Sequence, residues 1–120
     1  MNTYPFPKSY RLIRSAEFRK VYNEGKTVRS KAFQLFYLMG EENKPARLGI
    51  TVTRSYGKAV QRNRVKRLIR EAFRRAHSCL KFGYQMVINV RSQAEGLTQK
   101  EVSSELENLF SKAGLNRSAD

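Results

Sequence analysis

Residues 57–76 read GKAVQRNRVKRLIREAFRRA, and this stretch decides the fold. Its apolar side chains recur at intervals of three and four residues, the spacing that places them on one face of an α-helix. They are Val65, Leu68, Ile69, Ala72, Phe73 and Ala76. The opposite face collects Asn63, Lys66, Arg67, Arg70 and Arg74, with Arg64 and Arg75 at its edges. The sequence therefore predicts a helix with one side in a core and the other side cationic.

A cationic helix face is often no more than a solvated surface. Such a face normally mixes charges, so that residues three or four apart form ion pairs. Here eleven Lys and Arg side chains occur from residue 44 to residue 75 with a single acid, Glu71. Repulsion between Lys66, Arg70 and Arg74 destabilises the helix unless anions lie between them. We therefore expect this face to bind phosphates, which arginine side chains hold in a bidentate manner.

Length and charge agree with a nucleic-acid partner. The chain has 120 residues, enough for one domain, with 24 Lys and Arg against 10 Asp and Glu, a net charge of +14. Residues 1–91 hold 21 basic and 5 acidic side chains, or +16, and residues 92–120 hold 3 and 5, or −2. We therefore expect the nucleic acid to contact the first three quarters of the chain. Residues 1–8 and 115–120 are expected to be flexible ends of this single RNA-binding domain.

Composition argues against several other classes of protein. Cys79 is the only cysteine, which excludes an internal disulfide and a thiolate zinc site. The longest fully apolar run, residues 35–39, is far shorter than the ~20 residues of a membrane span. The first thirty residues are charged throughout and contain no apolar signal segment, so we expect a cytoplasmic protein with no membrane partner.

The remaining segments predict an α+β fold. Ser15 is a candidate N-cap for a short helix over residues 15–24, which Gly25 would end. Alternating apolar residues predict strands over 33–39, 47–53 and 84–90, with a weaker strand signal at 26–29. The turn between the first two of these predicts a hairpin. Thr98 and Glu101 form a capping box for a last helix, which Gly114 would end. We expect a small two-layer sandwich in which a short mixed β-sheet packs with about three helices.

A second group of candidate residues is aromatic. In alternating strands, Phe36, Thr51 and Thr53 lie on the sheet face opposite the apolar sets that would share the main core. With Phe18 and Tyr22 of the first helix they could stack on bases of single-stranded RNA. The same aromatic side chains could instead form a second small core under that helix, and the residues alone favour this alternative slightly.

No arrangement of residues in the sequence suggests protein-based catalysis. His77 is the only histidine, and no carboxylate or nucleophile is spaced to assist it, so a helix cap or a solvated side chain is expected. Glu41 and Glu42 lie in a predicted turn, where solvation is more common than metal binding. Cys79 is expected to be a small core or boundary residue. We therefore expect no catalytic residue and no metal site on the protein.

The basic helix also resembles a known family. Residues 57–74, preceded by RLGITVTR at 47–54, are similar to the signature region of the bacterial ribonuclease P protein subunit. The segment FRKVY at 18–22 and the Leu109-Phe110 pair fit the same family, and the resemblance covers about residues 9–113. It departs from the usual pattern at Tyr22, where phenylalanine is common, and at Ser55, where a second lysine often follows Arg54.

The resemblance implies an auxiliary subunit of an endoribonuclease. Proteins of this family bind one catalytic RNA, and the complex removes the 5′ leader of precursor tRNA by Mg²⁺-dependent hydrolysis that the RNA performs. No cofactor would be bound by the protein alone, and the protein would be a monomer within the complex. The family fold also contains a left-handed crossover between parallel strands, against the usual right-handed rule.

The resemblance also assigns binding roles to residues. The residues expected to bind the catalytic RNA are Lys58, Arg62, Asn63, Arg64, Lys66, Arg67, Arg70 and Arg74. Those expected to bind the single-stranded leader, in a central cleft, are Phe18, Tyr22, Phe36, Thr51, Thr53 and Arg54. The main alternative is a non-enzymatic ribosomal or RNA-assembly protein that uses the same helix. A DNA-binding protein is less favoured, because no partner helix or dimer face to position the basic helix is apparent.

Overall fold

The computed structural model describes residues 8–12 and 14–117. Three α-helices and four strands form the fold: α1 (Ser15–Glu24), β1 (Lys26–Arg29), β2 (Phe33–Met39), β3 (Arg47–Thr51), α2 (Ala59–Ala76), β4 (Tyr84–Val90) and α3 (Gln99–Lys112). Short 3-10 turns, including η1 (Lys8–Tyr10), η2 (Arg54–Tyr56) and η3 (His77–Cys79), join them. The α+β class, the mixed sheet and the three helices confirm the sequence-based prediction.

The strand order corrects one prediction. The sheet runs β1-β2-β4-β3, so β2 and β3 are not a hairpin: β4 lies between them, antiparallel to β2 and parallel to β3. The reason lies in β4, whose consecutive residues Met86, Val87 and Ile88 are all fully buried. A strand buried on both faces belongs in the middle of a sheet, with a neighbour on each side. The chain therefore passes from β3 through α2 to β4 as a parallel crossover, and its left-handed sense stays a prediction from the resemblance.

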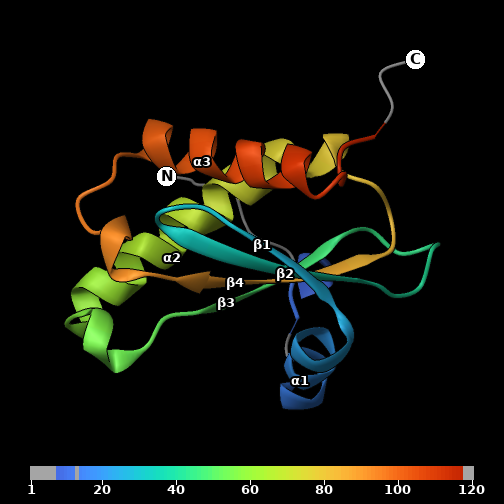
Figure 1. The fold of residues 1–120 in the computed structure, drawn as a ribbon, viewed down its shortest axis with the longest axis horizontal. Helices are drawn as coiled ribbons and strands as arrows, with labels where there is room; N and C mark the ends of the chain where they lie inside the picture. The colour runs from blue at the N-terminus through green and yellow to red at the C-terminus, as the bar shows by residue number, and fades with distance from the viewer. Residues whose placement is uncertain (1–7, 13, 118–120) are drawn as a thin grey trace.

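Helices cover both faces of the sheet. Figure 1 shows α2 and α3 on one face and α1 on the opposite face. The main core lies between the sheet and the two longer helices, and its largest buried side chains include Phe33, Phe73 and Phe110. A smaller cluster of Leu12, Val21 and Val87 lies under α1. The expected sandwich of sheet and helices is therefore present, with α1 as an additional layer.

The helix boundaries follow the sequence signals with small shifts. Thr98 and Glu101 form the expected capping box: the Thr98 N–H donates to Glu101 Oε1 over 2.9 Å and the Glu101 N–H to Thr98 Oγ1 over 3.2 Å. At α1 the N-cap is Arg14 and not Ser15, because the Arg14 N–H donates to Oε1 of Glu17 over 3.2 Å. Gly25 ends α1 as expected, whereas β3 ends at Thr51, two residues before the predicted end.

The chain ends were expected to be flexible. Residues 1–7 and 118–120 lie outside the described residues. Among residues 115–117, Leu115 is buried, Asn116 pairs with Leu80 and the Arg117 N–H donates to the Cys79 carbonyl over 2.7 Å, so these contacts attach the segment to the fold. Cys79 itself is exposed, and the expectation of a core or boundary residue is wrong. Across the described residues, every helix is too short or too polar to span a membrane.

Candidate nucleic-acid interface

The first part of the site is the outward side of α2. We call it the basic face, and it comprises the eight residues predicted from the sequence: Lys58, Arg62, Asn63, Arg64, Lys66, Arg67, Arg70 and Arg74. This side of α2 faces outward because the apolar residues of the other side are buried in the core. The buried residues are Val65, Leu68, Ile69, Ala72 and Phe73. Lys58, Asn63, Arg64 and Arg67 are exposed, and the other four are half-buried. No predicted member of the basic face is fully buried.

Two arginines at the start of α2 are held by backbone carbonyls. Arg62 Nη1 donates to the Gly57 carbonyl over 2.6 Å, and Arg64 Nη2 donates to the Leu97 carbonyl over 3.2 Å. A neutral carbonyl leaves the charge of each guanidinium uncompensated while it restricts the side chain. Ordered cations lose less conformational entropy when they bind a phosphate.

One member of the basic face is partly neutralised. Glu71 Oε2 lies 2.7 Å from Arg74 Nη2 and 2.7 Å from Arg75 Nε. The hydrogen bond from Arg74, assisted by Arg75, holds the pKa of Glu71 below its usual range even though partial burial opposes this. The six other cations of the basic face form no ion pair within the described part of the chain: Lys58, Arg62, Arg64, Lys66, Arg67 and Arg70.

The second part of the site lies between α1 and the sheet. We call Phe18, Tyr22 and Phe36 the aromatic cluster. All three rings pack on the small core under α1 and stay half-buried. The Tyr22 and Phe36 rings meet edge to face, with 4.8 Å between their centroids. The small core expected as one alternative is therefore present, its rings are not fully buried, and base stacking on them stays a prediction.

Glycine 49 explains the position of the Phe18 ring. Because Gly49 has no side chain, the ring lies directly against the backbone of β3, and a Cβ atom there would overlap the ring. Close approach of another group is one of the main reasons for a glycine inside a strand.

The predicted polar residues of this region divide into two groups. Thr51 joins the aromatic cluster, since its Oγ1 lies 2.9 Å from the Tyr22 hydroxyl oxygen. Thr53 and Arg54 are exposed beyond the end of β3, where Thr53 Oγ1 lies 2.8 Å from Ser55 Oγ. They therefore lie along the chain between the aromatic cluster and the start of α2, and do not themselves line the cluster.

Sequence reasoning missed two residues of this region. Asn89 accepts a hydrogen bond of 2.6 Å from the Tyr22 hydroxyl at its Oδ1. The sequence contained a signal for Asn89, because this polar residue interrupts the apolar strand 84–90 on the face opposite Met86 and Ile88. Arg11 carried no such signal, because the isolated parallel bridge between Arg11 and Leu48 depends on tertiary contacts.

Arg11 and Arg70 connect the two parts of the site. They line one hollow of about 160 Å³ together with Phe18, Gly49 and other residues of β3 and the N-terminal segment. Burial, assisted by the nearby charge of Arg11, lowers the pKa of Arg70 from its usual value. Two arginine residues that line a common hollow offer it positive charge, which favours a phosphate. This arginine hollow makes the basic face and the aromatic cluster one continuous surface.

His77 is the histidine that the sequence offered as a candidate for acid–base chemistry. In the described residues no three His, Cys, Asp or Glu side chains gather in a way that could hold a metal ion. The ring of His77 stacks on Tyr10, with 3.7 Å between centroids, and its Nε2 lies 3.0 Å from the Ala46 carbonyl oxygen. Burial lowers the pKa of His77, although the bond to Ala46 opposes this. His77 is the C-cap residue of α2, as one of the two expectations had it, and its ring is packed rather than solvated.

Known proteins share both the sequence pattern and the fold of this chain. The profile of the family Ribonuclease P matches residues 6–114. The chain belongs to this family. Among its relatives, the ribonuclease P protein component of Clostridium kluyveri is 40% identical over 108 residues, which cover 88% of this chain and 96% of the relative. That of Desulforapulum autotrophicum is 37% identical over 112 residues, covering 93% and 95%.

Solved structures of ribonuclease P proteins share the fold. The protein from Staphylococcus aureus superposes with a TM-score of 0.83 at 30% identity, covering 92% of this chain and all of that one. The protein from Thermotoga maritima gives a TM-score of 0.77 at 31% identity, covering 85% and 96%. These likenesses confirm the family and the fold that the basic helix suggested.

Tyr22 was one of two departures from the ribonuclease P pattern, and its environment gives a reason for the hydroxyl. The extra oxygen bonds Thr51 and Asn89, so it ties α1 to β3 and β4 at once. The ring keeps its contact with Phe36, and the substitution therefore preserves the aromatic cluster. At the second departure, Ser55 bonds Thr53 and leaves Arg54 as the only cation of that turn.

Proposed function

We propose that this chain is the protein subunit of ribonuclease P, the ribonucleoprotein in which a catalytic RNA removes the 5′ leader of precursor tRNA. The observation that carries the proposal is the continuity between the basic face and the aromatic cluster through the arginine hollow. A ligand that fits both parts must offer many phosphates on one side and an unpaired strand on the other. A catalytic RNA with the leader of its substrate beside it has this character.

In this proposal the basic face binds the catalytic RNA. Six cations without acidic partners in the described part of the chain lie on a rigid helix, and folded RNA brings phosphates from several strands close together. Asn63 is exposed among them and offers both a donor and an acceptor to a sugar or a base edge. Arg74 contributes less than the other members, because Glu71 shares its charge.

The single-stranded leader crosses the aromatic cluster. Half-buried rings present faces and edges on which unpaired bases stack, and stacking tolerates any base sequence. Thr53 and Arg54 lie exposed where the strand would pass toward α2. The phosphate next to the stacked base would lie in the arginine hollow between Arg11 and Arg70.

Catalysis in this proposal belongs to the RNA. Mg²⁺ supplies the activation of water and the stabilisation of charge in phosphodiester hydrolysis. The described residues offer no carboxylate cluster for it, and a cationic surface repels a divalent cation. The protein, a cytoplasmic monomer within the complex, holds the leader beside the RNA and so raises the affinity for precursor over mature tRNA.

The experiment combines this chain with its cognate catalytic RNA and measures the affinity for precursor and mature tRNA. Adding the chain should strengthen binding of the precursor and leave mature tRNA unchanged. Phe18→Ala should weaken precursor binding by about 1–3 kcal/mol, the value of one stacked base, with no effect on mature tRNA. Phe82→Ala is the matched control, because Phe82 is an exposed aromatic residue distant from α1 in the sequence.

A second pair of variants tests the basic face. Arg67→Ala should weaken binding of the catalytic RNA itself, whereas Lys100→Ala on α3 should not. Equal affinity for precursor and mature tRNA with the wild-type chain would contradict the proposal and favour a ribosomal or RNA-assembly role. Equal loss for both tRNAs in Phe18→Ala would mean that Phe18 is only a core residue.

A further inference from the structure

Arg11 belongs to the N-terminal segment, residues 8–12, which runs beside β3 at the edge of the sheet. Its side chain lines the arginine hollow together with Arg70 of α2. Two like charges at close range repel each other, so a loosely held segment would move Arg11 away from Arg70. The arrangement therefore requires contacts that hold this segment in place.

Two anchors hold the residues on either side of Arg11. Before it, the ring of Tyr10 stacks on His77, with 3.7 Å between the centroids. After it, Leu12 is buried in the small core under α1, and its N–H donates to the Leu48 carbonyl over 3.0 Å. These contacts place the segment along β3 but leave the Arg11 carbonyl to another partner.

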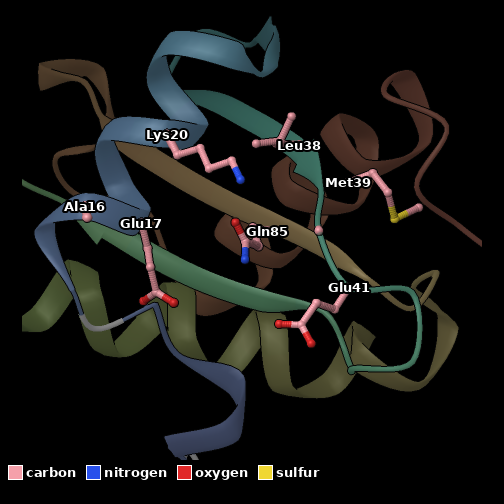
Figure 2. A pocket seen from close by; sticks show the side chains of 8 residues that line it. Ala16, Glu17, Lys20, Leu38, Met39, Glu41 and Gln85 are labelled. Atoms are coloured by element: carbon pink, nitrogen blue, oxygen red, sulfur yellow. The ribbon is translucent and has the colours of Figure 1, made fainter.

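That partner is Arg47, at the start of β3. Its guanidinium donates twice to the Arg11 carbonyl oxygen, from Nε over 3.1 Å and from Nη2 over 2.9 Å. The same group binds Glu17 of α1, with 3.0 Å between Nη1 and Oε2 and 3.2 Å between Nη2 and Oε1. Figure 2 shows Glu17 extending from α1 across β3, at the border of a separate hollow. One side chain thus joins the N-terminal segment, α1 and β3.

The chemistry of the guanidinium explains why an arginine suits position 47. It presents five N–H donors in one rigid plane, and here all three nitrogens contact either the carbonyl of Arg11 or the carboxylate of Glu17. A lysine has a single nitrogen and cannot reproduce this set of bonds. The Arg47 side chain is only 19% exposed and Glu17 compensates its charge, so Arg47 is poorly placed to bind a phosphate itself.

We propose that Arg47 is a positioning residue for the RNA site: it holds the Arg11 carbonyl and so keeps Arg11 beside Arg70, where both arginines meet one phosphate. The inference rests on the proposed function. A segment that is already ordered loses less conformational entropy when the phosphate binds. Loss of the bonds from Arg47 should therefore weaken the phosphate contact even where the net charge of the chain is unchanged.

The test uses the complex of this chain with its catalytic RNA and measures how the affinity for precursor and for mature tRNA depends on salt. Arg47→Lys keeps the net charge but loses the paired bonds to the Arg11 carbonyl. It should weaken precursor binding about three- to tenfold at low salt and flatten the slope of log K against log salt concentration by about 0.7, the value of one single-strand phosphate contact. Mature tRNA should bind as before. Arg29→Lys, the same exchange at an exposed position of β1, is the matched control and should change neither tRNA.

Three further variants separate positioning from stability. Arg11→Gln should flatten the slope as much as Arg47→Lys, and the double variant should flatten it no further, because both changes act on one contact. Glu17→Gln removes the ionic partner of Arg47 and keeps the Arg11 carbonyl bonded, so it should lower the midpoint of urea unfolding without flattening the slope. Arg47→Met keeps the apolar stem without any donor, should flatten the slope equally, and provides the same test if Arg47→Lys does not fold.

The outcomes distinguish this inference from the function on which it rests. If the wild-type complex prefers precursor to mature tRNA but the Arg47 variants leave the salt slope unchanged, the inference is overturned and the function stands. Losses that add in the double variant also overturn it, because Arg47 would then act independently of Arg11. An equal loss for mature tRNA overturns it as well. If precursor and mature tRNA bind equally to the wild-type complex, the proposed function itself fails.

Discussion

Replacing Glu71 by glutamine should strengthen RNA binding. Glu71 is the only acid on α2, and it shares its charge between Arg74 and Arg75. The side chain of Arg74 is 25% exposed and that of Arg75 is 63% exposed. Arg74 lies on the same side of the helix as Lys66 and Arg70, because residues four apart are neighbours on a helix surface. Glu71→Gln therefore adds one available cation to the basic face.

The expected change in the salt dependence of RNA binding follows from the number of cations on the basic face. Six cations without an acidic partner in the described residues predict that log K falls with log salt concentration with a slope of about −4 to −5. One further phosphate contact should steepen this slope by about 0.7–0.9. An exposed ion pair is worth about 0.2–1 kcal/mol, so affinity at fixed low salt should rise by about 1.5- to fivefold.

The assay is a salt titration of the affinity between this chain and its catalytic RNA. Glu107→Gln removes an exposed acid from α3 and is the matched control, with no change in slope expected. An unchanged slope in Glu71→Gln would show that Arg74 does not face the RNA. Weaker binding in Glu71→Gln would also refute the prediction. It would mean that Glu71 orients Arg74 and Arg75 for contact with the RNA and does not compete with the RNA for them.

Three further substitutions test other contacts. Tyr22→Phe removes two side-chain hydrogen bonds and should lower the free energy of unfolding, measured in urea, by about 1–2 kcal/mol. An unchanged free energy would mean that the hydroxyl group bonds water in the unfolded chain as favourably as it bonds Thr51 and Asn89 in the fold. Gly49→Ala would push the Phe18 ring from β3, and should weaken precursor binding while catalytic-RNA binding persists; unchanged precursor affinity would separate Phe18 from the leader. His77 has a lowered pKa when folded, so the unfolded chain binds more protons between that pKa and about 6.5, and stability should fall as the pH drops through this window. His77→Gln should flatten that dependence in thermal unfolding, and an equal slope in both proteins would assign it to other groups.

Local signals in the sequence were sufficient for most elements. The apolar stripe of α2, the Thr98 capping box and the alternation of β2 and β4 each depend on residues close together in the chain, and each appears in the structure. The pairing of strands depends instead on distant residues. A short turn between residues 39 and 47 favoured a hairpin, but β4, whose central residues Met86, Val87 and Ile88 are buried, gains more by lying between β2 and β3 than at an edge.

The residues of the site also divide into those that local sequence patterns predict and those that depend on contacts between distant parts of the chain. The basic face could be predicted because one helix carries it, and its angular spacing is fixed by the helix itself. The aromatic cluster could be predicted only in part, since Phe18 and Phe36 come from different elements and their meeting depends on how α1 crosses the sheet. Arg11 could not be predicted, because it reaches the site through a bridge to Leu48, 37 positions further along the chain.

The strand order explains how one small chain joins its two binding surfaces. β3 pairs with β4 on one side, and its end leads through η2 directly into α2. Gly49 of β3 supports the Phe18 ring, and Thr51 bonds Tyr22, so β3 is also the wall of the aromatic cluster. A hairpin of β2 and β3 would have left β4 outside this arrangement and Asn89 away from Thr51, to which it is now aligned. The parallel crossover, which the family resemblance implied but the strand patterns alone did not, is therefore what fixes the basic face next to the aromatic cluster.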